Sequence, residues 1–134
     1  MDDRLAAQLL TLVTRCSERF DAEDHRAFAE CFTEDGTMVT SGGELVAGRT
    51  ALIGFSGVWH RENAGTVRHT TAEHRFTLDS AGTFGACTVR IQMIPASGAG
   101  PVLQRWYADG YEFHDGMWRI RERRVLLAPT GTDP

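Results

Sequence analysis

The chain has 134 residues, of which 42% are hydrophobic and 24% are charged, and its formal net charge is −4. This length fits one domain with its own core, and the composition is that of a globular protein, which excludes wholesale disorder. Because a mildly acidic chain lacks the clustered cations that phosphate backbones require, nucleic acid is not an expected partner.

The 14 basic residues are all arginine. Without lysine the chain cannot form a Schiff base, hold pyridoxal phosphate or build a Walker A phosphate loop. Arginine keeps its proton at ordinary pH, so any proton transfer falls to His, Asp, Glu, Tyr or Cys. The three cysteines form no C-x-x-C motif, and neither a helical histidine pair nor a cofactor fingerprint occurs. No metal and no cofactor are therefore expected.

The N-terminus shows no basic-then-apolar pattern, and no apolar run reaches 18 residues. These absences predict a soluble, cytoplasmic protein without a membrane partner.

The first half of the chain has the spacing of helices. Apolar side chains at steps of three and four predict an amphipathic helix over about residues 3–19. Asp24 is the expected N-cap of a short second helix, and Thr50 the expected cap of a third. Between them, residues 33–36 predict a turn, and residues 37–41 and 44–47 predict a small hairpin.

After residue 65 the pattern changes to alternation, which predicts strands at about residues 69–78, 84–94, 102–113 and 117–127. The last two strands are joined so closely that they must form an antiparallel hairpin. Since helices and strands are segregated, the predicted fold is α+β, with three N-terminal helices packed on a curved antiparallel sheet. A single domain over residues 1–127 and a flexible tail over residues 128–134 are expected.

On the strand at 102–113, alternation places Arg105, Tyr107 and Asp109 on one face. If that face is concave, Tyr107 and Asp109 point into one apolar cavity, where a carboxyl group shielded from water can serve as an acid or base. The alternative is that Asp109 pairs with an arginine of the next strand, Arg119, Arg121 or Arg123. Residues 119–124 are expected to form a salt-bridged strand face rather than an anion site.

His69 begins the first long strand, next to Arg68. A histidine at the edge of a helix–sheet cavity can shuttle protons, because histidine titrates near neutral pH. The alternative is a hydrogen-bonded packing histidine.

Helix aromatics and one strand amide are candidate ligand contacts. Phe20, Phe55 and Trp59 lie on predicted helices, where they serve either as core or as the wall of a pocket for a flat ligand. Gln92 is solvent-exposed or, if it faces inward, can hydrogen-bond a substrate without accepting its proton.

Several segments resemble the nuclear-transport-factor-2-like superfamily: residues 20–24 (FDAED), residues 28–36 (FAECFTEDG) and Gly48-Arg49. Arg68-His69, Tyr107-Ala108-Asp109 and residues 116–120 (GMWRI) narrow the resemblance to its SnoaL-like branch, over about residues 5–126. The resemblance implies a cone-like curved sheet around three helices, with a deep apolar pocket at the open end. Members include polyketide cyclases, dehydratases, ketosteroid isomerases, epoxide hydrolases and non-catalytic binding domains.

The resemblance also implies roles for single residues. Arg68-His69 matches the place where the dehydratases keep a catalytic histidine, and Asp109 resembles the acid of the isomerases. Cys16 stands where a tyrosine is usual, Thr40 where the isomerases hold a base aspartate, and Gln92 where the epoxide hydrolases hold an aspartate. These departures argue against a plain isomerase, hydrolase or scytalone-type dehydratase.

The resulting hypothesis is a cofactor-independent cyclase, dehydratase or isomerase acting on a small apolar metabolite of polyketide or terpenoid type. His69 and Asp109 would exchange protons, and Tyr107 would donate to a developing oxyanion. The expected substrate contacts are Cys16, Phe20, Thr40, Phe55, Trp59 and Gln92. The resemblance further implies a homodimer through the outer face of the sheet. The alternatives are a non-catalytic small-molecule-binding or dimerisation domain, which the lost acid and base positions favour, and a protein–protein adaptor.

Overall fold

The computed structural model describes residues 3–63, 66–79, 82–94 and 102–128; for residues 66–67, 71–72, 78–79, 82–94 and 102 it describes the backbone alone. The helices are α1 (Asp3–Asp21), α2 (His25–Glu30) and α3 (Arg49–Glu62). The strands are β1 (Phe32–Val39), β2 (Leu45–Ala47), β3 (Thr66–Asp79), β4 (Gly82–Ile94), β5 (Val102–His114) and β6 (Met117–Leu126). The predicted tail at residues 129–134 lies outside this description.

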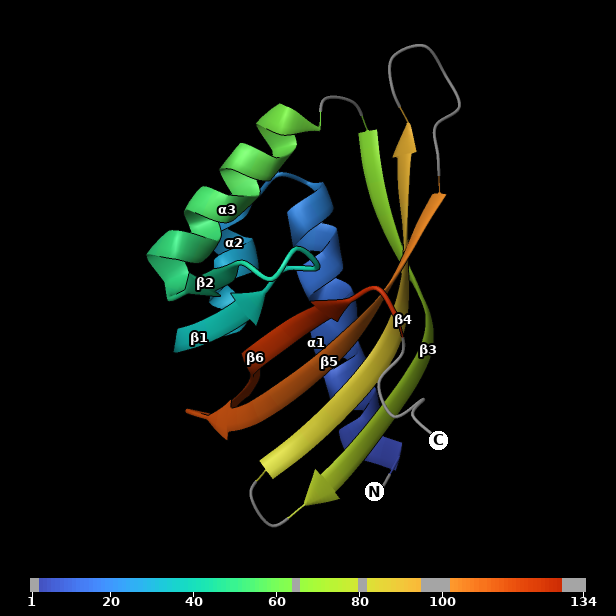
Figure 1. Ribbon diagram of the computed structural model, residues 1–134. Helices are drawn as coiled ribbons and strands as arrows, with labels where there is room; N and C mark the ends of the chain where they lie inside the picture. The colour runs from blue at the N-terminus through green and yellow to red at the C-terminus, as the bar shows by residue number, and fades with distance from the viewer. Residues whose placement is uncertain (1–2, 64–65, 80–81, 95–101, 129–134) are drawn as a thin grey trace.

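The strands form one curved sheet in the order β2-β1-β6-β5-β4-β3, and the three helices lie on one side of it (Figure 1). The predicted α+β fold with three helices on a curved sheet is confirmed. The sheet is mixed rather than wholly antiparallel, because β1 pairs parallel to β6 while the other neighbouring pairs are antiparallel. This pairing joins residues far apart in the sequence, so local patterns carry no signal for it.

Two local predictions differ from the structure. Residues 33–36, predicted as a turn, lie within β1, where the pairing with β6 shifts between Phe32 and Thr37. Thr50 does not cap α3, because the helix begins after Gly48, which has a φ of 88° and makes no side-chain cap. The cap predicted at Asp24 is confirmed, since its carboxylate accepts a hydrogen bond from the backbone N–H of Ala27 at 3.1 Å.

The core lies between α1 and the inner face of the sheet. The buried apolar face of α1 is the one predicted from its spacing, and it meets Phe32 of β1, Tyr111 of β5 and Ile120 of β6 in one cluster. Burial of side chains of this size contributes about 1.5–3 kcal/mol each relative to exposure, so this cluster anchors α1 against the sheet. The wider space above it, toward α3, holds the pocket.

Gly36 lies at the irregular stretch of β1, where a Cβ atom would come within 2.8 Å of the Cβ of Phe32 and 2.9 Å of the Thr33 carbonyl oxygen. Because backbone cannot move aside cheaply, Gly36→Ala is expected to lower the free energy of unfolding by about 1–3 kcal/mol. Gly54→Ala is the matched control, since its Cβ would meet nothing within 4 Å. Because alanine is more stable than glycine within a helix, Gly54→Ala is expected to raise the free energy of unfolding by about 0.5–1 kcal/mol. Urea unfolding of both variants measures the difference, and a Gly36→Ala variant as stable as the parent contradicts it.

Candidate active site

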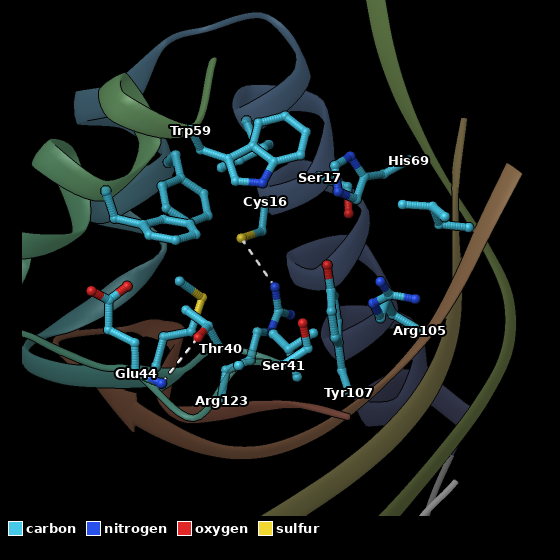
Figure 2. A pocket seen from close by; sticks show the side chains of 17 residues that line it. Cys16, Ser17, Thr40, Ser41, Glu44, Trp59, His69, Arg105, Tyr107 and Arg123 are labelled. Carbon is cyan, nitrogen blue, oxygen red and sulfur yellow. Dashed lines mark hydrogen bonds between the residues drawn. The ribbon is translucent and has the colours of Figure 1, made fainter. Parts of the chain in front are cut away.

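A cavity of about 300 Å³ lies between the helices and the inner face of the sheet (Figure 2). It is lined from all three helices, the β1–β2 hairpin and strands β3, β5 and β6. The predicted site residues on its wall are Cys16, Phe20, Thr40, Phe55, Trp59, His69 and Tyr107. The side chain of Gln92 lies outside the described residues, and Asp109 is not among the residues that line the cavity.

Aromatic rings form the helix side of the pocket, around Phe20 near the end of α1. The Phe20 ring centroid lies 5.2 Å from that of Trp59 and 6.5 Å from that of Phe55, both on α3. It also lies 5.0 Å from the ring of Phe28 on α2, nearly perpendicular to it. Such a wall offers a large apolar area to a flat ligand, so these residues act as core and pocket wall together.

His69 on β3 is bound to Asp21, the last residue of α1. The His69 Nδ1 atom lies 2.5 Å from Asp21 Oδ1, and the His69 backbone N–H donates to Oδ2 at 2.6 Å. Both side chains are largely shielded from solvent, with exposures of 7% for His69 and 17% for Asp21. Because the carboxylate accepts from both groups, it fixes the position of the ring and favours the tautomer with the proton on Nδ1.

Asp109 is held in an ion pair. Its two carboxylate oxygens accept hydrogen bonds from Nε and Nη2 of Arg123, each at 2.9 Å, and the Tyr111 hydroxyl also donates to it at 2.9 Å. The two paired residues face each other across β5 and β6 and are both buried. An ion pair between Asp109 and an arginine of the next strand was the alternative predicted from the sequence, and the structure shows that ion pair with Arg123. The structure therefore brings His69 and Tyr107 to the cavity wall but leaves Asp109 behind it, since the carboxylate is turned toward the guanidinium.

Arg123 also lines the pocket, with the part of its guanidinium that is not bound to Asp109. Its guanidinium carbon lies 4.0 Å from the centre of the Tyr107 ring, and its Nη1 atom lies 3.7 Å from Cys16 Sγ. Burial would lower the pKa of this guanidinium, but the Asp109 carboxylate opposes that effect and holds the pKa well above its usual value. The group is thus a permanent cation in the pocket wall. Residues 119–124 were expected to form a salt-bridged strand face; Arg123 is salt-bridged, through Asp109, and it lies buried on the inward face of β6.

Cys16 and Cys31 are free, buried thiols, and Cys16 lines the pocket. The hydrogen bond from Cys16 outweighs burial and, together with the guanidinium of Arg19, lowers the pKa of Cys31 to about 6. The hydrogen bond with Cys31, together with burial, raises the pKa of Cys16 well above its usual value. Cys16 therefore faces the cavity as a neutral thiol.

The most informative partner in this site, Asp21, was not predicted from the sequence. Asp21 was part of the motif that carries the family resemblance, yet its bond to a residue 48 positions away has no local signature. Arg105, Ser17 and Glu44 also line the cavity and were not predicted as contacts. The one signal that could have found Arg105 is strand alternation, which places it on the same face as Tyr107.

Within the described parts of the chain, no three His, Cys, Asp or Glu side chains are grouped to hold a metal ion. Over the same residues, none of the helices has the length and apolar character needed to cross a membrane.

Solved structures share this architecture. Aln2 from a Streptomyces species superimposes with a TM-score of 0.86 at 19% identity, covering 94% of this chain and 92% of that one. Rv3472 from Mycobacterium tuberculosis, a protein of unknown function, has a TM-score of 0.82 at 27% identity, covering 96% and 75%. A Catenulispora acidiphila protein in complex with S-DNPA has a TM-score of 0.78 at 19% identity, covering 93% and 94%.

No curated protein sequence matches significantly. The sequence pattern of the SnoaL-like domain, however, matches residues 3–124, nearly the whole chain. The chain belongs to the SnoaL-like domain family, as its helix and strand motifs predicted.

Proposed function

We propose that the protein binds a small, largely apolar organic molecule in this pocket and transfers protons on it without a cofactor, as a cyclase, dehydratase or isomerase does. The observation that carries the proposal is that His69 lies on the cavity wall while Asp21, behind it, holds its Nδ1 atom. A packing histidine needs a hydrogen bond but no adjoining cavity, whereas this ring has both. Membership of a family that includes such enzymes supports the same conclusion.

His69 is the proposed base and acid. With Nδ1–H donating to Asp21, the Nε2 lone pair takes a proton from a carbon next to a carbonyl group, and the C–H electron pair moves to form an enolate. Asp21 stabilises the imidazolium that results. The proton then returns to a different atom in an isomerisation, or to a departing hydroxyl group in a dehydration. In a cyclisation the pocket holds the reacting ends together.

Tyr107 is the proposed neighbour of the developing oxyanion, because it lies on the cavity wall beside the guanidinium of Arg123. Positive charge and O–H donors near that oxygen stabilise negative charge as it forms. We do not assign acid chemistry to Asp109, since its oxygens are bound to Arg123 and Tyr111. Its proposed contribution is to hold Arg123 in place. A homodimer through the outer face of the sheet and a cytoplasmic location stay predictions.

Deuterium exchange into 2-tetralone, a neutral bicyclic ketone, tests the proton transfer. Proton NMR in D₂O is expected to show faster loss of the protons next to the carbonyl with the protein than without it. His69→Asn is expected to lower the protein-dependent rate by about 10²–10⁴-fold. The matched control is His114→Asn, whose side chain is 71% exposed at the far end of β5 and which is expected to keep the full rate.

Equal rates in the parent protein and the His69→Asn variant would contradict the proposal. A ketone that binds in the pocket and is recovered without any exchange would favour the alternative, a non-catalytic binding domain of the same fold.

A further inference from the structure

Two guanidinium groups lie on the sheet side of the pocket, those of Arg105 on β5 and Arg123 on β6. The Arg123 side chain is only 4% exposed, and two of its three nitrogens are bound to Asp109. Among the described residues, the partner of the third nitrogen, Nη1, is the sulfur of Cys16 at 3.7 Å. Because a thiol sulfur is a weak acceptor, this buried cationic donor has, within the described part of the chain, no oxygen partner of the kind that such groups normally have.

Arg105 brings a second cation to the same corner. It precedes Tyr107 by two residues on the same face of β5 and is half-buried, with Nη1 donating to the carbonyl of Gln104 at 2.9 Å. Figure 2 shows the Tyr107 ring drawn between the two guanidinium groups, while Glu44 lies on the opposite side of the view. Asp109 compensates the charge of Arg123, whereas the charge of Arg105 has no ion-pair partner among the residues that the structure describes.

We infer that this corner is an anion subsite and that the ligand is a small aromatic or polycyclic carboxylic acid. Its carboxylate would accept hydrogen bonds from Arg123 Nη1 and from Arg105, and its apolar body would lie against the rings around Phe20. A single carboxylate matches the uncompensated charge. Because Asp109 already holds Arg123 rigid, little ordering entropy is lost when the ligand binds. The inference rests on the proposed use of the pocket and adds the substrate class.

The test compares two probes of nearly the same shape, 2-naphthylacetic acid and 2-naphthylacetamide, by isothermal titration calorimetry at pH 7.5. The acid is ionised at this pH, whereas the amide carries no charge. The parent protein is expected to bind the acid about 10-fold more tightly or better, as charge-assisted hydrogen bonds to a partly desolvated guanidinium allow. This comparison needs no variant, so it does not depend on how well Arg123 variants fold.

Arg105→Gln is expected to reduce the preference for the acid by about 10-fold, because half-buried Arg105 supplies the uncompensated charge. The matched control is Arg124→Gln, which removes the same charge from an exposed position next to Arg123 on the other face of β6. This control is expected to keep the preference of the parent.

The inference is overturned if the acid binds no more tightly than the amide, if neither probe binds, or if Arg124→Gln loses as much preference as Arg105→Gln. The proton-transfer proposal is measured on a neutral ketone and through His69. If the protein shows no preference for the acid, the deuterium-exchange result for the ketone still stands. If the protein does not catalyse exchange, the measured preference for the acid still stands.

Discussion

Asp109→Ala is expected to lower the free energy of unfolding by about 3–5 kcal/mol, the largest stability effect that we predict for a single substitution. The change leaves the buried Arg123 guanidinium without its carboxylate, and burying an uncompensated charge is expensive. It also removes an acceptor of the Tyr111 hydroxyl. Since small domains are stable by only about 5–15 kcal/mol, this is a substantial share of the total.

The double variant Asp109→Leu/Arg123→Met is the control, because it removes both charges and keeps apolar volume in their place. It is expected to recover most of the loss, as buried ion pairs often contribute little beyond an apolar pair of similar size. Urea unfolding followed by far-UV circular dichroism measures both proteins. If the free energy of unfolding of Asp109→Ala is within about 1 kcal/mol of that of the parent, Arg123 does not depend on Asp109 for compensation of its buried charge.

Asp21→Asn is expected to lower the turnover number for ketone exchange by about 10²-fold or more while leaving KM unchanged. Asp21 does not line the cavity, so it has no contact with the ligand to lose. Its bond to His69 Nδ1 sets the tautomer, however, and an asparagine amide can donate to Nδ1 and favour the proton on Nε2. The lone pair needed by the base would then face away from the substrate.

Nitrogen NMR of the His69 ring distinguishes this positioning role from a purely structural one, because a change of tautomer alters both nitrogen chemical shifts. Asp24→Asn is the matched control: it makes the same substitution three residues away, at the N-cap of α2, where asparagine caps as well as aspartate. We expect it to keep the parent rate and tautomer. A changed His69 tautomer with an unchanged turnover number would show that Asp21 does not serve catalysis.

Much of this fold could be predicted because its signals are local. The apolar spacing of α1 and the alternation along β5 each follow from neighbouring residues, and both placed side chains on the faces where the structure has them. The same alternation brought Tyr107 to the cavity wall and Asp109 to the interior. Alternation alone could not show whether the Asp109 carboxylate faces the cavity or an arginine, because the cavity and Arg123 are both on the inner face of the sheet.

The order of the elements and the inner face of each strand were thus determined by the sequence itself, since periods of 3.6 and 2 residues are properties of short segments. Only the tertiary structure decided which side chains meet. It set Arg123 opposite Asp109 through the register of β5 and β6, and it brought the end of α1 to His69 across 48 residues. Such contacts depend on how elements pack and pair at long range, and that information is spread over the whole chain rather than held in any one motif.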